Sequence, residues 1–62
     1  MITTENLGNF KIKVSFRENN EEQGFIVLEE TIDVINIVDV LTKEEYRRKG
    51  IATKLFDYII NN

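Results

Sequence analysis

The chain has 62 residues, with 11 acidic and 8 basic side chains and a net charge of −3, so it forms one small domain at most and its charge disfavours nucleic acid as a partner. It contains no cysteine and no histidine, which excludes disulfides, thiolate or imidazole metal ligands and a histidine base. No apolar run is long enough to cross a membrane, and we expect a cytoplasmic protein without a metal site.

The N-terminal part of the chain carries a strand pattern that begins after Gly8. Apolar residues at every second position alternate with charged or polar ones, and the apolar set is Phe10, Ile12, Val14 and Phe16. This period of two, with one dry and one wet face, predicts a half-exposed antiparallel strand over residues 9–17. Residues 1–8 show only a weak pattern, and we expect them to be a loose terminus.

Two further strands are predicted before residue 43. A polar stretch ends at Gly24, and the short apolar run that follows it predicts a strand over residues 24–30. Residues 33–42 are rich in Ile and Val, which favours a strand, but Asp33, Asn36 and Asp39 break the alternation. A β-bulge would explain the broken alternation, so we expect this third strand to be bulged.

A loop over residues 43–49 and a helix over residues 50–60 are expected to complete the chain. The apolar residues at positions 52, 55, 56 and 59 follow the spacing of one helix face. Arg47, Arg48 and Lys49 lie just before this helix, where its dipole is already positive and its first amides lack partners. Positive charge in that place is unfavourable unless an anion binds, so the cations and Gly50 indicate a phosphate-binding turn.

A second interpretation of the same segment stays open from the residues alone. Thr42 and Glu45 fit a capping box, with Thr42 as the N-cap of one helix that runs over residues 43–60. Gly50 would then lie inside this helix, and the basic side chains would be solvated. On the first interpretation the order of elements predicts an α+β fold, in which a three-stranded antiparallel β-meander is followed by one α-helix within a single domain over residues 1–62.

The spacing of Arg47, Gly50 and Ala52 matches the Q/R-x-x-G-x-G/A signature of the GNAT family of N-acetyltransferases, and the flanking segments 38–42 and 51–55 match as well. The chain therefore resembles this family. The resemblance implies a partial GNAT fold of β-β-β-α order, truncated to the core that binds acetyl-CoA, and transfer of an acetyl group from acetyl-CoA to an amine. Within the family, the strand-loop-helix segment most resembles N-terminal acetyltransferases of the ribosomal-protein type. This resemblance implies a protein N-terminus as the acceptor.

The resemblance also implies roles for individual residues. The basic turn would bind the diphosphate of acetyl-CoA, and the end of the bulged strand would hold its pantetheine arm. The implied cofactor-binding residues are Val40, Leu41, Thr42, Arg47, Arg48, Lys49, Gly50, Ile51, Ala52 and Thr53. Asp39 beside the bulge and Glu30 at a strand end are weak candidates for a catalytic base, because a solvated carboxylate is the commoner role of such residues. We interpret Tyr58 as packing and Tyr46 as an anchor under the turn.

In the resembled family, further elements accompany this module. A first strand and two helices precede it, more strands and a helix follow it, and these elements shape the acceptor site and supply catalytic groups. We therefore expect the chain to be inactive as a transferase on its own. The alternative function is that of an inactive remnant or a small interaction module, which folds by pairing with another chain. The partner would be a second copy or a complementing fragment, joined at the Ile32–Leu41 edge or over the uncovered face of the sheet.

Overall fold

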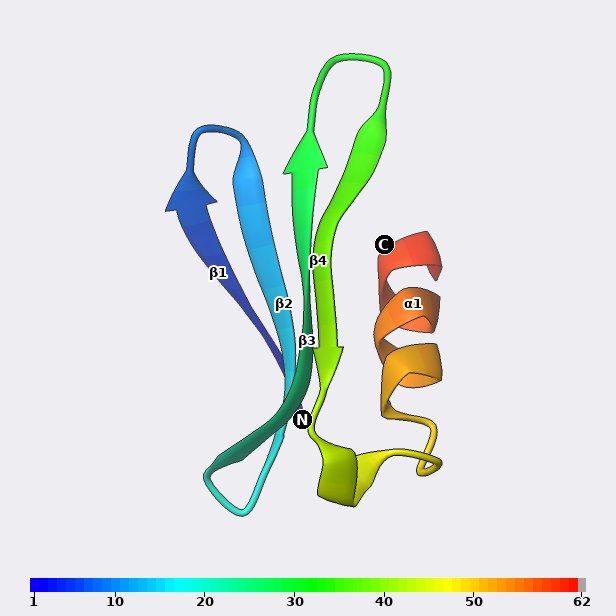
Figure 1. Cartoon of the computed structure of the whole chain (residues 1–62). Coiled ribbons are helices and arrows are strands. Elements are labelled where there is room, and N and C mark those ends of the chain that lie inside the picture. Colours follow the sequence, from blue (N-terminus) through cyan, green and yellow to red (C-terminus); the bar gives the residue numbers. More distant parts are fainter. Residues whose placement is uncertain (62) are drawn as a thin grey trace.

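The computed structural model describes residues 1–61 and shows an α+β fold, in which a four-stranded antiparallel sheet is followed by one α-helix (Figure 1). The strands are β1 (Ile2–Gly8), β2 (Lys11–Glu18), β3 (Glu21–Glu30) and β4 (Ile35–Thr42), and they pair in sequence order. A one-turn 3-10 helix, η1 (Glu44–Tyr46), follows β4, and the α-helix α1 (Ile51–Asn61) ends the described chain. The antiparallel meander followed by a helix therefore matches the predicted fold class.

The expectation of three strands is wrong, because residues 2–8 form a fourth strand instead of a loose terminus. The amino group of Met1 donates to the carbonyl of Arg17 at 2.9 Å, and the amide of Arg17 donates to the carbonyl of Met1 at 2.8 Å. Ile2 packs against the core, whereas most other side chains of β1 are exposed. Hydrogen bonds of the main chain thus hold β1 in place. Because these bonds do not depend on the side chains, the sequence of β1 shows no alternation of apolar residues.

Two-residue turns join the first three strands. The central residues Asn9 and Phe10 have φ values of 51° and 65°, and Asn19 and Asn20 have values of 54° and 63°. Positive φ at both central residues fits the twist of a tight hairpin. The expectation that Phe10 belongs to the dry face of a strand is wrong, because Phe10 lies in the turn and its side chain is 78% exposed. Its carbonyl still accepts from the amide of Glu30 in β3 at 2.9 Å.

A β-bulge lies in β4, the strand for which the broken alternation indicated one. Val27 of β3 faces Asp39, whereas the next residue, Leu28, faces Ile37, so Val38 is the extra residue. Ile37 and Val40 consequently face β3 residues whose side chains point to the same side of the sheet. The bulge therefore keeps apolar residues on the α1 side in both halves of β4.

The core lies between α1 and one face of β2 and β3. Its buried side chains are Val14, Phe16, Ile26, Leu28, Ile51 and Leu55. Gly24 allows the start of α1 to approach closely, because a Cβ atom there would lie 2.9 Å from the carbonyl oxygen of Leu41 and 3.0 Å from Cγ2 of Ile51. The eleven residues of α1 span about 16 Å, and the ten residues of β3 span about 33 Å. The helix therefore covers only the part of the face next to η1, and the β3–β4 loop extends beyond it (Figure 1).

Candidate functional site

The segment between β4 and α1 does not form one continuous helix. Lys43 precedes η1 without a side-chain cap, so Thr42 is not the N-cap, and the chain leaves helical geometry after Tyr46. Arg48 and Gly50 have φ values of 70° and 75°, which a right-handed helix cannot contain. The capping-box interpretation is therefore wrong, and residues 47–50 form a turn that leads into α1 at Ile51.

The start of α1 carries unpartnered backbone donors. The amide of Lys54 donates to the carbonyl of Gly50 at 2.9 Å, which is the first bond of the helical ladder. The amides of Ile51, Ala52 and Thr53 come before this bond, and no acceptor from residues 1–61 pairs with them. The first turn also holds no acidic side chain. Free amides at the positive end of the helix dipole favour an anion at this place.

A hollow of about 400 Å³ lies beside this helix start. We call it the loop hollow, and its lining residues are Thr42, Tyr46, Arg47, Arg48, Gly50, Ile51, Ala52 and Thr53. It thus brings together most of the residues that the sequence analysis assigned to cofactor binding. Val40, Leu41 and Lys49 of that set do not line it.

Tyr46 connects the turn to the sheet. Its hydroxyl donates to Oε1 of Glu21 at the start of β3 over 2.7 Å, and Nζ of Lys43 lies 3.7 Å from the same oxygen. The hydrogen bond to the Glu21 carboxylate raises the pKa of Tyr46 to about 12, because ionisation would place two negative charges side by side. The ring packs against the core. These contacts make Tyr46 the anchor under the turn that the sequence analysis expected.

The free edge of β4 leads away from the loop hollow. The amide of Lys43 donates to the carbonyl of Gln23 at 3.0 Å, so alternation along the antiparallel pair turns the backbone of Val40 and Thr42 away from β3. Leu41 faces β3, and its carbonyl oxygen lies close to Gly24. Within residues 1–61 no strand pairs with this edge. The backbone groups of Val40 and Thr42 are therefore open to a ligand, and those of Leu41 are not.

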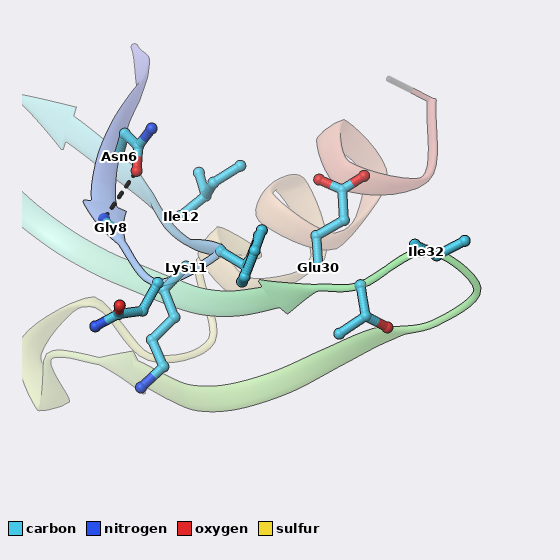
Figure 2. Close-up of a pocket in the computed structure, with 9 residues that line it drawn as sticks. Asn6, Gly8, Lys11, Ile12, Glu30 and Ile32 are labelled. Atoms are coloured by element: carbon cyan, nitrogen blue, oxygen red, sulfur yellow. Dashed lines mark hydrogen bonds between the residues drawn. The ribbon is translucent and has the colours of Figure 1, made fainter.

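The two candidate bases lie outside the loop hollow. Asp39 pairs with Val27, whose neighbours Ile26 and Leu28 point into the core, so the Asp39 side chain lies on the sheet face opposite α1. Glu30 ends β3 and lines a different hollow of about 710 Å³ between the β1–β2 turn and the β3–β4 loop. Figure 2 shows Glu30 and Ile12 pointing to the same side of the sheet there, whereas Lys11 points to the other. The structure brings neither carboxylate to the basic turn.

A feature that the sequence reasoning missed is a second hollow, of about 470 Å³, which borders the same turn. We call it the lysine hollow, and its lining residues are Phe16, Glu18, Asn19, Gln23, Tyr46, Lys49, Ile51 and Lys54. Nζ of Lys49 lies 5.6 Å from the centre of the Tyr46 ring, and Nζ of Lys54 lies 5.1 Å from that of Phe16. The signal in the sequence that could have indicated this hollow is the pair Lys49 and Lys54, which lie on either side of the helix start at Ile51.

Two other kinds of site find no support in the described part of the chain. Residues 1–61 contain no group of three or more His, Cys, Asp or Glu side chains that could hold a metal ion. Neither helix of this region has the length and apolar character needed to cross a membrane.

Comparison with known proteins gives one family. The model of the acetyltransferase (GNAT) family matches residues 5–61, from β1 to the end of the described helix. Neither the curated proteins nor the solved structures contain a significant match.

Proposed function

The chain belongs to the acetyltransferase (GNAT) family, and from this premise we propose that it binds acetyl-CoA at the turn before α1, for transfer of the acetyl group to an amine. The observation that carries the proposal is the set of unpartnered amides at Ile51, Ala52 and Thr53, next to two arginines and without an acidic side chain in the first helical turn. A diphosphate carries the charge and the acceptor oxygens that this arrangement lacks.

The loop hollow would hold the diphosphate. The three free amides would donate to its oxygens, and Arg47 and Arg48 would add charge-assisted hydrogen bonds. Gly50 has a φ of 75°, and beyond its two chain neighbours no described atom lies within 4 Å of the place where its Cβ would be. The backbone can therefore approach a bound phosphate closely at this position.

The free edge of β4 would hold the pantetheine arm. The backbone groups of Val40 and Thr42 are open to it, and the edge leads from the loop hollow towards the bulge at Val38. Acetyl-CoA supplies the thioester-bound acetyl group, and the proposed acceptor is an amine such as a protein N-terminus. Of the two candidate bases, Asp39 is adjacent to the bulge, whereas Glu30 pairs with Ile35, about 10 Å further along β4. We therefore keep Asp39 as the candidate that removes the proton of the amine.

Two glycines give a matched test of this proposal. Gly8 and Gly50 both have positive φ, at 80° and 75°, and neither has an atom within 4 Å of its would-be Cβ. An alanine therefore causes similar backbone strain at either position, but only at Gly50 would it meet the ligand. In isothermal titration with CoA we expect Gly50→Ala to weaken binding by about tenfold or more and Gly8→Ala to leave it unchanged. Equal affinities of the two folded variants would contradict the proposal.

A second candidate function rests on the exposed side of β4. Ile35, Ile37, Val38, Val40 and Leu41 are all exposed, although their strand has an unpaired edge. An apolar strand with a free edge favours pairing with another strand, which is the interaction module that folds with a partner chain. Sedimentation at micromolar concentration tests it: a dimer that CoA dissociates would show that the partner and CoA compete for the chain, as expected if both use the β4 edge at Val40 and Thr42. A monomer with and without CoA would exclude self-pairing.

A further inference from the structure

Two exposed lysines place their ammonium groups beside the lysine hollow. Lys49 lies over the ring of Tyr46, and Lys54 lies over the ring of Phe16. Tyr46 is tied to Glu21 and Phe16 is part of the buried core, so neither ring is free to move away. Cation–π contacts favour positions of the ammonium groups above the rings and leave their N–H donors available. The entropic cost of ordering two long side chains around a ligand is thereby reduced.

The charge of the lysine hollow is positive. Glu18 is the one carboxylate among its lining residues, and an oxygen of this side chain lies 3.9 Å from the amino group of Met1. The negative charge of Glu18 is therefore partly offset from outside the hollow. Asn19 and Gln23 add side-chain amides that can donate hydrogen bonds. Two lysines and two amides suit a compact anion with several acceptor oxygens, such as a phosphate monoester.

The lysine hollow and the loop hollow are neighbours. Tyr46 and Ile51 line both of them, so a ligand that occupies the loop hollow can reach the lysine hollow around the turn 47–50. CoA carries two separate phosphate groups, which are the diphosphate and a monoester on the 3′ position of its ribose. The two hollows, which share Tyr46 and Ile51, thus match the two phosphate groups in number and in the sign of their charge.

We propose that the lysine hollow binds a nucleotide phosphate monoester, and that Lys49 and Lys54 there recognise the 3′-phosphate of acetyl-CoA. This inference rests on the proposed binding of acetyl-CoA at the turn and assigns Lys49 to the monoester instead of the diphosphate. It makes the chain selective for CoA over dephospho-CoA, which has the same diphosphate and pantetheine arm. Lys54, which lies outside the apolar helix positions 52, 55, 56 and 59, becomes a residue that determines specificity.

The test compares CoA with dephospho-CoA by isothermal titration. We expect the unaltered chain to bind CoA about tenfold more tightly, as one or two charge-assisted hydrogen bonds would give. In the double variant Lys49→Met and Lys54→Met the ratio should fall to about one, since methionine keeps an apolar stem over each ring but has no charge. Lys11→Met, which removes a lysine at the other end of the sheet, is the control and should preserve the ratio.

Equal affinities of the unaltered chain for CoA and dephospho-CoA would overturn the proposal, and so would an unchanged ratio in the double variant. Adenosine 3′-monophosphate separates these failures from failure of the proposed function. If CoA does not bind at the turn, the acetyl-CoA proposal is wrong. Amide shifts at residues 49 and 54 on addition of adenosine 3′-monophosphate, lost in the double variant, would still support a monoester site, and their absence would overturn it.

Discussion

At one end of the sheet the side chains are fixed by packing and hydrogen bonds, whereas at the other end apolar side chains are open to solvent. The fixed end contains the Tyr46–Glu21 hydrogen bond and the buried helix residues Ile51 and Leu55. The open end contains the β1–β2 turn and the β3–β4 loop, where Phe10 is 78% exposed and Ile32 is 99% exposed. Both ends belong to the same continuous strands, so the difference comes from what covers them.

The short helix is the cause of this difference. Because α1 reaches along only about half the length of β3, no layer formed by residues 1–61 covers the ends of the strands beyond it. All the groups that we assign to the phosphates of acetyl-CoA lie at the covered end, where the turn is held in place before a ligand arrives. The buried and hydrogen-bonded side chains of this small domain are therefore concentrated at its proposed ligand-binding end.

The largest expected effect comes from deleting a core side chain at the covered end. Leu55 is 0% exposed, and Leu55→Ala should lower the free energy of unfolding by about 2–5 kcal/mol, whereas Ile32→Ala should change it by less than about 0.5 kcal/mol. Chemical denaturation followed by circular dichroism measures both. If Leu55→Ala does not fold, Ile51→Val gives a milder version, with a loss of about 0.5–1.5 kcal/mol. Similar losses of unfolding free energy for Leu55→Ala and Ile32→Ala would show that the covered end is not more tightly packed than the open end.

The next effect comes from filling the contact between sheet and helix. In Gly24→Ala the new Cβ would lie 2.9 Å from the Leu41 carbonyl oxygen and 3.0 Å from Cγ2 of Ile51, so a strand or the helix start must shift. We expect a loss of about 1–3 kcal/mol in the free energy of unfolding. Backbone chemical shifts should change at Leu41 and Ile51 and stay constant in the β3–β4 loop. Unchanged stability would mean that the helix start is not held against β3 at this point.

The sequence predicted the covered end better than the open end. The apolar spacing of residues 52–59 predicts α1, and the β-branched run before residue 43 predicts β4 with its broken alternation. It could not predict β1, because main-chain bonds between Met1 and Arg17 hold that strand and no side-chain pattern reports them. Phe10 was misplaced for a related reason, since a two-residue turn overrides its apolar character.

Within the site, the sequence left two interpretations of residues 42–50 because both agree with local propensities. The structure has a turn between η1 and α1, and a contact between residues far apart in the chain accompanies it. Tyr46 bonds to Glu21, which is 25 residues away in the chain, and the turn after Tyr46 then separates η1 from α1. Lys54 was missed as a site residue for the same kind of reason, because only the fold brings it to one hollow with Lys49.

A smaller effect is expected from an ion pair near the β2–β3 turn. Glu22 accepts from Lys13 and from the Ser15 hydroxyl, each over 3.0 Å. Partial burial acts to raise the pKa of Glu22, but the hydrogen bonds from Lys13 and Ser15 outweigh it and hold the pKa below the ordinary value of 4.5. The pair should therefore stabilise the fold above pH 4.5, and this contribution should be lost as the pH falls through the lower pKa of the folded state.

The corresponding variant is Glu22→Gln, which should lose about 0.5–1.5 kcal/mol at neutral pH and less in acid. Glu30→Gln at the open end is the matched control, and we expect almost no loss. Denaturation curves at several pH values distinguish the two. A loss for Glu22→Gln that stays the same down to low pH would show that its charge is not what stabilises the folded chain.

The smallest expected effect concerns the hydroxyl that ties the turn to the sheet. Its hydrogen bond to Glu21 raises the pKa of Tyr46 to about 12, so this contribution is complete below the ordinary tyrosine value of 10 and is lost as the pH rises through about 12. Glu21→Gln should move the titration of Tyr46 back towards its ordinary value, which the assigned ring signals in NMR spectra can follow separately from those of Tyr58. Tyr46→Phe should keep the ring under Lys49 and release only the tether, so CoA affinity should fall slightly while the CoA preference over dephospho-CoA remains. A titration of Tyr46 that does not respond to Glu21→Gln would show that the turn is held by packing alone, and the covered end would then owe its order to the core and not to its polar contacts.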